Sequence, residues 1–196
     1  MALALFDFDG TITKQDSGFH FILYSVGWFK LFFYGIWLLP FFILRFCQIL
    51  TDQKIKELVF SLFFKGWEIE KLQKFGDNFG INKIPLLVRK SAIERIDWHK
   101  KRGDIITVVS ASSEIWLQKW CNSMEIGLIA SKMEVSEGKI TGKLIGKNCK
   151  REEKVSRIKE KYDISKFDEI YAYGDSIGDK EMLAIASNKF YRYFKD

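Results

Sequence analysis

The chain has 196 residues, which suits one ordinary domain or one domain that carries an insertion. Hydrophobic residues make up 47% of the sequence, so a sizeable core can be buried, and no repeat or low-complexity tract is present. The net charge of +6 favours anionic partners without choosing among phosphorylated metabolites, nucleic acids and membranes, while three widely spaced cysteines exclude a disulfide framework or a zinc knuckle.

The first predicted element is a short buried strand at residues 3–6, an apolar run that stops at Asp7. Residues 17–80 then depart from the strand–helix alternation found in the rest of the chain. We predict several consecutive helices there, of which residues 52–64 and 67–79 have amphipathic patterns. The simplest interpretation is a helical cap, inserted after the first strand and lying over the strand ends.

Within this block, residues 31–44 form an apolar run without charge between Lys30 and Arg45. Its 14 residues fall short of the roughly 18–20 that span a bilayer, and Pro40 interrupts it. We expect a core helix of the cap. The flanking cations and the nearby aromatic residues also describe a segment in a membrane interface, and this alternative stays open.

Beyond residue 80, helical patterns and apolar runs alternate. The expected helices are residues 85–101, 114–124, 151–162 and 179–186, and the expected strands are residues 104–110, 169–174 and 189–194. This alternation predicts a parallel sheet covered by helices on both faces. Residues 132–145 differ, because Glu137, Gly138 and Lys139 separate two alternating segments and indicate a β-hairpin with its turn at Gly138.

The sequence therefore predicts an α/β fold with a catalytic core at residues 1–16 and 81–196 and a helical cap at residues 17–80. Three polar residues, Asp7, Ser110 and Asp175, come at the carboxyl ends of different predicted strands. In open α/β sheets, ligands bind at that edge. We expect these three side chains to meet there.

Residues 7–11, Asp-Phe-Asp-Gly-Thr, form the most informative motif. Two carboxylates two residues apart point the same way only if the chain leaves regular strand geometry, which Gly10 permits. Such a pair suits a hard cation such as Mg²⁺, and a carboxylate can also attack phosphorus to form an acyl phosphate. For the two aspartates taken alone, an acidic turn after a strand is a serious competing explanation.

Residues 174–179 repeat this pattern, with Asp175 and Asp179 just past another apolar strand. Either acid alone could belong to a turn or a helix N-cap. Two acidic strand ends on separate strands of one short chain arise by chance much less often than a single one does.

Two further positions carry groups that suit a phosphate. Ser110 ends the middle strand before a helix, where its hydroxyl and the neighbouring backbone N–H groups could bind a phosphate, while Ser112 or Ser113 is expected to be an N-cap. Lys154 could offset phosphate charge and the mutual repulsion of the carboxylates. A lysine on a solvated helix face is the competing explanation for that position.

Together the four motifs resemble, in residue type and order, the haloacid dehalogenase (HAD) superfamily of phosphatases, and the resemblance spans nearly the whole chain. Residues 108–112 and 148–154 are similar to subfamily IB, which includes phosphoserine phosphatase. The resemblance implies a Rossmann-like core, Mg²⁺ as cofactor, and hydrolysis of phosphate monoesters through an aspartyl phosphate.

The same resemblance implies a role for each motif residue. Asp7 would attack the phosphorus, and Asp9 would protonate the leaving alcohol and then activate the attacking water. The implied Mg²⁺ ligands are Asp7, Asp9 through its backbone carbonyl, Asp175 and, directly or through water, Asp179. The implied phosphoryl-binding groups belong to Ser110, Ala111 and Lys154. Positioning and charge neutralisation of this kind are what phosphoryl transfer mainly needs.

The substrate is less well defined. Phosphoserine phosphatases usually have Asn where this chain has Gly178 and Glu where it has Asp16, which disfavours phosphoserine. The cap, with residues 14–16 before it and 38–40 within it, is similar to phosphatidylglycerophosphatase C, a phospholipid-phosphate phosphatase of the same subfamily. We therefore expect a phosphorylated small molecule or a lipid phosphate as substrate, and peripheral contact of the cap with a membrane.

Four alternatives stay open: a soluble phosphatase for a small metabolite, a phosphotransferase or mutase, an inactive scaffold and a basic nucleic-acid-binding protein. The intact motif acids argue against the scaffold. The aromatic residues gather with apolar residues rather than with Lys and Arg, so no nucleic-acid partner is expected.

The expected location is the cytoplasm, at the inner face of the membrane if the cap binds it. We expect Cys47, Cys121 and Cys149 to be reduced thiols. No signal peptide is expected, because Asp7 and Asp9 interrupt the N-terminal segment before a long apolar run can form. The oligomeric state is left open.

Overall fold

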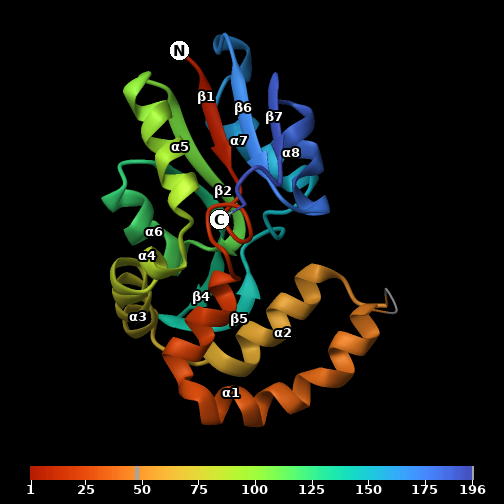
Figure 1. Ribbon diagram of the computed structural model, residues 1–196. Helices are drawn as coiled ribbons and strands as arrows, with labels where there is room; N and C mark the ends of the chain where they lie inside the picture. Colours follow the sequence, from red (N-terminus) through yellow and green to blue (C-terminus); the bar gives the residue numbers. More distant parts are fainter. Residues whose placement is uncertain (47–48, 196) are drawn as a thin grey trace.

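A computed structural model describes residues 1–46 and 49–195 of the chain (Figure 1). Its centre is a five-stranded sheet in the order β3-β2-β1-β6-β7, in which every neighbouring pair is parallel. The strands are β1 (Leu3–Phe6), β2 (Ile105–Ser113), β3 (Gly127–Ser131), β6 (Ile170–Gly174) and β7 (Asn188–Tyr191). This arrangement confirms the predicted α/β fold with a Rossmann-like parallel sheet.

The alternating side chains of β1 enter two separate apolar clusters, one on each face of the sheet. Ala4 and Phe6 pack on the face covered by α5 (Lys90–Lys101) and α6 (Glu114–Ser123). Leu3 and Leu5 pack on the opposite face, which α7 (Glu152–Lys161) and α8 (Lys180–Ala184) cover. Because β1 is central and buried on both faces, its sequence is a continuous apolar run rather than an alternating one.

Three elements differ from the sequence-based expectations. The helix expected at residues 85–101 is divided into α4 (Ile84–Leu87) and α5, because Thr13 pairs with Val88 and the Arg89 N–H donates to the Ile12 carbonyl. The last helix is preceded by a 3-10 turn at Ile177–Asp179. Strand β3, which was not expected, pairs with β2 at the sheet edge.

The block inserted after β1 lies beyond the carboxyl ends of the strands, at the lower end of Figure 1. It consists of α1 (Ser17–Phe46), α2 (Asp52–Phe64) and α3 (Ile69–Asn82). The predicted hairpin is confirmed as β4 (Met133–Ser136) and β5 (Lys139–Leu144), and it packs against α2, where a side chain on Gly142 would collide with Ser61. The division into a core and a cap at residues 17–80 stays a prediction.

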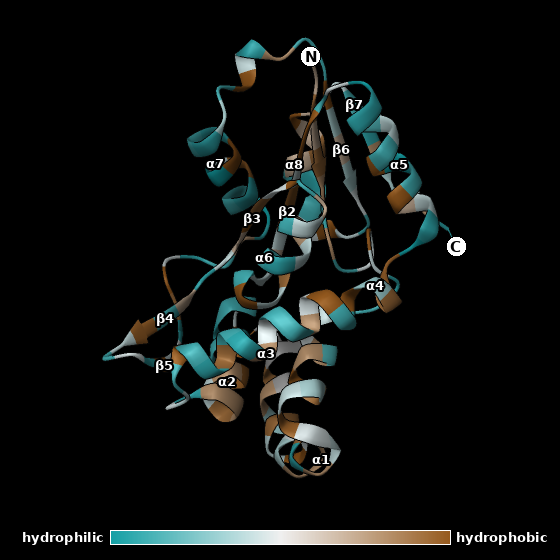
Figure 2. Ribbon diagram, turned by 90° about the vertical axis from the view of Figure 1, so that its left-hand side faces the viewer, coloured by the Kyte–Doolittle hydropathy of each residue, from teal (hydrophilic) through white to brown (hydrophobic). Residues whose placement is uncertain are grey.

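Helix α1 is longer and more exposed than expected. It bends at Gly27, whose φ of 78° favours glycine, and continues through Pro40. The expectation of a buried core helix at residues 31–44 is wrong for most of that run, because Phe32, Phe33 and Trp37 are at least 64% exposed while only Leu38 among its described side chains is buried. Figure 2 shows this helix at the end of the molecule farthest from the chain's N-terminus.

By length and composition, Ser17–Phe41 is apolar enough to cross a membrane, with a mean hydropathy of 1.5. Cys121 and Cys149 are free and buried. Cys47 lies outside the described residues.

Candidate active site

Three neighbouring strands carry the predicted site residues to one edge of the sheet. Asp7 follows β1, Ser110 lies near the end of β2, and Asp175 follows β6. The register places Phe6 beside both Val108 and Tyr173, so Asp7, Ser110 and Asp175 all lie one or two residues beyond the same row of the sheet. The polar groups that are far apart in sequence therefore meet, as the parallel order requires.

Lys154 connects two of the acids from the first turn of α7. Its Nζ lies 2.5 Å from Asp7 Oδ1 and 2.6 Å from Asp179 Oδ1, and its side chain is 2% exposed. Burial alone would lower the pKa of Lys154, but the charges of Asp7 and Asp179 outweigh burial and raise it. The lysine is therefore a permanent cation beside the two carboxylates. The competing explanation, that Lys154 lies on a solvated helix face, is wrong.

The three acids Asp7, Asp175 and Asp179 form one cluster, with one carboxylate oxygen of each within 4.8 Å of the others. Burial raises the pKa of Asp7 to about 7, against the opposing charge of Lys154. Burial also raises the pKa of Asp175, while for Asp179 the charge of Lys154 outweighs burial and lowers the pKa. One lysine beside three oxygen ligands leaves negative charge that a hard divalent cation would balance, so this donor set fits Mg²⁺.

Gly10 and Thr11 allow the acids to approach each other. The φ of Gly10 is +84°, and a Cβ atom there would lie 2.5 Å from Asp175 Oδ2. Thr11 Oγ1 lies 3.3 Å from Asp7 Oδ2 and 3.2 Å from Asp175 Oδ1, so one hydroxyl lies between the two strand ends. Gly10 and Thr11 therefore help to assemble the acid cluster in addition to forming the turn after β1.

Asp9 lies apart from the acid cluster and points toward a different set of donors. Its carboxylate accepts a hydrogen bond of 2.6 Å from the Ser17 backbone N–H and one of 2.5 Å from Ser112 Oγ. Burial and the nearby charge of Asp16 raise the pKa of Asp9. A carboxyl group with a raised pKa can hold a proton for transfer, which suits a general acid.

These groups open onto a cavity of about 520 Å³ between the sheet edge and the helical block. The polar wall includes Asp7, Asp9, Ser110, Ala111 and Lys154. The lining from α1 and α2 is mostly apolar, although α2 also supplies the charged Asp52 and Lys56; its apolar members are Phe19, Ile22, Ile55, Val59 and Phe60. A ligand here would place a charged group against the sheet and an apolar group against the helices.

Comparison with known proteins agrees with this geometry. The sequence matches the family model of the haloacid dehalogenase-like hydrolases over residues 4–184. The chain belongs to the HAD-like hydrolase family. The HAD superfamily resemblance inferred from the motifs is thereby confirmed.

A curated relative and two solved structures illustrate the similarity. Protein CicA of Caulobacter vibrioides (strain NA1000 / CB15N) is 30% identical over 197 residues, covering 98% of this chain and 86% of CicA. A Bordetella pertussis Tohama I protein of unknown function is 23% identical, with a TM-score of 0.81 over 95% of this chain and 87% of that one. A phosphoserine phosphatase, solved as a phospho-aspartyl intermediate analogue, is 23% identical, with a TM-score of 0.67 over 95% of this chain and 84% of that one.

Two site residues of this HAD-like hydrolase were missed by the sequence analysis. The first is Ser112, which donates to Asp9, while its neighbour Ser113 is the N-cap of α6. The alternation of side chains along a strand puts Ser110 and Ser112 on one face, and this pattern could have indicated the role of Ser112. Lys56 of α2 donates to the Ala111 carbonyl at 2.6 Å and to Asn148 Oδ1 at 2.8 Å. No sequence pattern distinguishes Lys56 from an ordinary lysine of an amphipathic helix.

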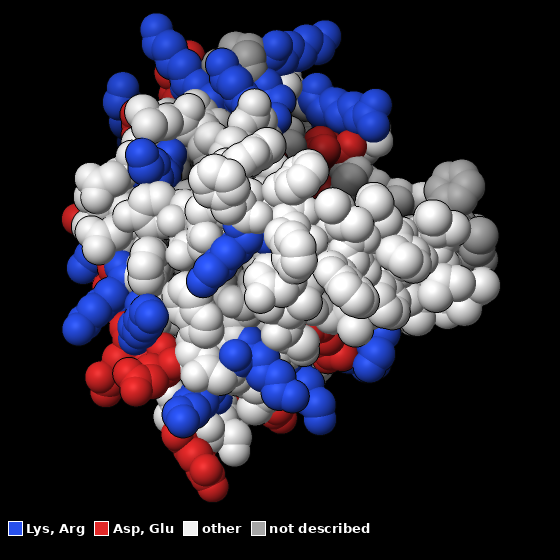
Figure 3. Space-filling model, turned by 90° about the horizontal axis from the view of Figure 1, so that it is seen from below, with Lys and Arg blue, Asp and Glu red and all other residues white. Residues whose placement is uncertain are grey.

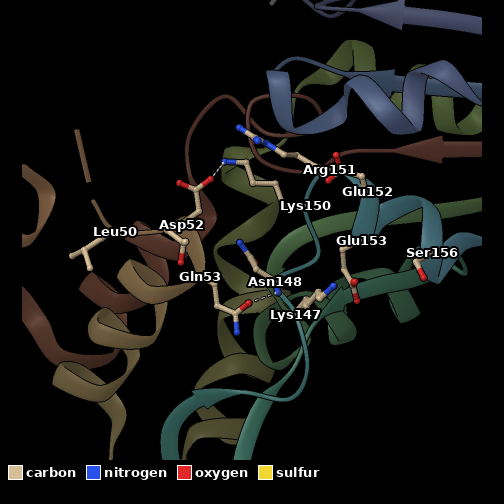
Figure 4. A pocket seen from close by; sticks show the side chains of 11 residues that line it. Leu50, Asp52, Gln53, Lys147, Asn148, Lys150, Arg151, Glu152, Glu153 and Ser156 are labelled. Carbon is tan, nitrogen blue, oxygen red and sulfur yellow. Dashed lines mark hydrogen bonds and ion pairs between the residues drawn. The ribbon is translucent and has the colours of Figure 1, made fainter. Parts of the chain in front are cut away.

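A second, polar cavity of about 880 Å³ adjoins the first one in this HAD-like hydrolase (Figure 4). Asp52 and Lys150 line both cavities, and they form an ion pair of 2.7 Å between α2 and the loop before α7. Gln53 Oε1 accepts a hydrogen bond of 3.3 Å from the Asn148 N–H across the same gap. These contacts fasten α2 to the loop that leads to Lys154.

Proposed function

We propose that this HAD-like hydrolase is a Mg²⁺-dependent phosphate-monoester hydrolase that works through an aspartyl phosphate on Asp7. The observation that carries the proposal is the setting of the Asp7 carboxylate. It lines the cavity, contacts the cation of Lys154, and lies within a cluster of acids suited to a divalent metal. A carboxylate so placed can meet a phosphate despite its own charge.

The first chemical step forms the bond between an Asp7 carboxylate oxygen and phosphorus while the bond to the leaving alcohol breaks. Asp9, whose pKa is raised by burial, donates its proton to the departing alcohol oxygen. Asp9 then takes a proton from the water that attacks the aspartyl phosphate, which releases inorganic phosphate and restores Asp7. Ser17 and Ser112 hold the Asp9 carboxylate in one orientation for both transfers.

The cations and donors around Asp7 would neutralise the transferred phosphoryl group. We assign this binding to Lys154, the Ser110 hydroxyl and the Ala111 N–H, all of which belong to residues that line the cavity. The proposed Mg²⁺ ligands are Asp7, the Asp9 backbone carbonyl and Asp175, with Asp179 in support. Mg²⁺ bound there would supply the positive charge that phosphoryl transfer requires.

The apolar wall of the cavity favours a substrate with an apolar part. Phe19 and Ile22 from α1 and Val59 and Phe60 from α2 line the same cavity as the acids. We therefore propose a phospholipid phosphate, such as phosphatidylglycerophosphate, as the substrate. A small polar ester such as phosphoserine would leave this wall in contact with water.

Phosphate release in the presence of Mg²⁺ tests the proposal. Phosphatidylglycerophosphate in detergent micelles, phosphoserine and an aryl phosphate should be compared, and we expect the lipid to give the highest kcat/KM. Asp7→Asn should lower all activity by roughly a thousandfold or more, because the nucleophile is lost. Preference for the soluble esters would contradict the lipid assignment and leave the hydrolase assignment standing.

Acid quenching during turnover tests the intermediate itself. We expect phosphate bound covalently to the native chain and none on Asp7→Asn. Asp9→Asn should lower the rate of phosphoserine hydrolysis more than that of an aryl phosphate, whose leaving group needs no proton. A native chain that hydrolyses esters without ever carrying phosphate would contradict the covalent route.

A further inference from the structure

The outer half of α1 exposes a large apolar surface that no described part of the chain covers. Eight large apolar side chains of this segment are at least half exposed: Trp28, Phe29, Phe32, Phe33, Ile36, Trp37, Leu39 and Ile43. We call these eight residues the outer face of α1. Contiguous apolar surface of this kind on a protein marks an interaction site.

The outer face of α1 is broad. At about 100° per helical residue, its eight side chains spread over about half of the helix circumference. The opposite side packs on the protein, where Leu38 is buried and the Tyr34 ring lies 6.1 Å from that of Phe63 in α2. A helix that is apolar over half its surface and packed on the other half matches a helix lying at a lipid–water boundary.

The charges on α1 are only of one sign. No Asp or Glu occurs from Ser17 to Thr51, whereas Lys30 is exposed and lies by its spacing at the margin of the outer face. Seen from this side, the molecule presents a largely uncharged expanse that is interrupted by blue Lys or Arg atoms and bordered by Lys and Arg together with fewer Asp and Glu (Figure 3). Cations that border an apolar surface suit anionic lipid headgroups.

We propose that the outer face of α1 binds the surface of an anionic lipid bilayer, with the helix lying in the plane of the interface. This membrane binding extends the proposed function. It rests on that function in one respect, namely that the bilayer would be the source of the lipid substrate. The partner is a membrane surface carrying acidic headgroups.

The position of α2 argues for a helix in the interface rather than across the bilayer. Helix α2 packs along the outer half of α1 and carries Lys54 and Glu57. It also supplies Lys56, Val59 and Phe60 to the catalytic cavity. A crossing α1 would have to leave this helix or draw its charged side chains into hydrocarbon, which is costly.

The same helix links the outer face to the catalytic cavity. Before the bend at Gly27, α1 contributes Gly18, Phe19 and Ile22 to the cavity wall. A bilayer bound by the outer half of α1 would therefore contact a helix whose first turns line the cavity. A lipid phosphate could reach the acids while its chains stay near the membrane.

A second copy of the chain fits the outer face less well. In a two-fold dimer each face would meet an identical face. Lys30 would then enter an interface in which α1 offers no acidic residue to pair with it. Anionic headgroups provide that missing charge.

Flotation with preformed vesicles tests the proposal. The native chain should bind vesicles of phosphatidylcholine mixed with phosphatidylglycerol more tightly than vesicles of phosphatidylcholine alone. The triple variant F29Q/W37Q/I43Q should lose about a hundredfold or more in affinity, because three exposed apolar side chains no longer enter the bilayer. The matched control L86Q/I145Q/Y191Q alters apolar side chains of comparable exposure elsewhere and should bind as the native chain does.

Lys30→Gln tests the role of charge. It should weaken binding to the anionic vesicles about fivefold, the fold-change that corresponds to about 1 kcal/mol for one cation near such a surface. Binding to phosphatidylcholine vesicles should not change. Failure of the native chain to bind either vesicle, or equal binding by the triple variant, would overturn the proposal.

Two further measurements separate this proposal from its rivals. Light scattering without lipid should show the same molecular mass for the native chain and the triple variant; a native dimer that the triple variant dissociates, with no vesicle binding, would assign the face to self-association. Asp7→Asn should bind vesicles as the native chain does, and the triple variant should hydrolyse an aryl phosphate normally. Vesicle binding without any phosphatase activity would refute the proposed function and keep the docking surface.

Discussion

Two lysines of the site, the buried Lys154 and the half-buried Lys56, have opposite electrostatic settings. Lys154 contacts two carboxylates, whereas Lys56 donates to two neutral oxygens, the Ala111 carbonyl and Asn148 Oδ1. Burial lowers the pKa of Lys56 to about 8, while the more distant charges of Asp9 and Asp16 oppose that shift. Lys154 therefore keeps its charge at any working pH, and Lys56 loses its charge in mildly alkaline solution.

The charge of Lys56 predicts an alkaline limb in the pH profile. As the pH rises through about 8, Lys56 becomes neutral, and attraction of an anionic substrate to the cavity weakens. We expect kcat/KM for an aryl phosphate to fall over that range in the native chain. Lys56→Arg should move the fall by two units or more, because arginine stays protonated, and Lys56→Met should have lower activity without this limb. An unchanged limb in Lys56→Met would contradict the assignment.

At the residue scale, the sequence predicted the groups that lie in motifs. Asp7, Asp175, Asp179 and Lys154 are brought together by the structure, because parallel strands and the helices beside them deliver their ends to one edge. Lys56 was not predictable, since it reaches the site only through the packing of α2 over the sheet edge. The chemical roles of all these residues stay predictions.

At the element scale, the contact between α3 and α6 depends on a missing side chain. A Cβ atom on Gly76 of α3 would collide with the Ile115 backbone carbonyl of α6. Glycine lowers helix stability in isolation, so its presence here is explained by this close approach rather than by helix formation.

Gly76→Ala should therefore destabilise the protein although alanine favours helices. We expect a loss of about 1–3 kcal/mol in the free energy of unfolding, because the two helices must move apart. Gly35→Ala is the matched control: no atom lies within 4 Å of its Cβ position, and it should gain up to about 1 kcal/mol. Urea unfolding measures both. Stabilisation by both variants would show that α3 and α6 are not closely packed.

The elements themselves were predictable where local signals decide them. Helix α2 has the predicted bounds, because Thr51 caps it and its apolar positions follow a helical period. The break between α4 and α5 was not predictable, since it follows from the pairing of Val88 with Thr13, far away in the sequence. The exposure of α1 was left open between a core helix and a membrane-interface segment, because an apolar sequence does not show whether protein or another surface covers it.

At the scale of the whole molecule, the acid cluster ties together distant parts of the chain. Asp7 comes from the N-terminal strand, and Asp175 and Asp179 come from the loop after β6. Their mutual repulsion opposes folding, and among the described cations only Lys154 contacts two of the three. A divalent cation bound to the folded chain would remove this repulsion.

Mg²⁺ should therefore stabilise the fold in the absence of any substrate. We expect the thermal midpoint to rise with Mg²⁺ concentration, with a gain of about 2.7 kcal/mol at a hundred times the dissociation constant. Asp175→Asn should weaken this response. Asp163→Asn, which removes an exposed acid paired with Lys166, should leave it unchanged. A midpoint that does not depend on Mg²⁺ in the native chain would contradict a metal site at this cluster.

The ion pair between Asp52 and Lys150 has a kinetic consequence. Its two side chains are 29% and 33% exposed, so it stabilises the joined arrangement of α2 and the loop before α7 by about 1 kcal/mol at most. That energy corresponds to a ratio of only about five between the paired and unpaired states of these two side chains. Asp52 and Lys150 therefore separate often while Gln53 and Lys56 still hold α2 to Asn148 of the loop. The connection between the two cavities thus depends on the motion of two side chains and does not need the motion of a helix.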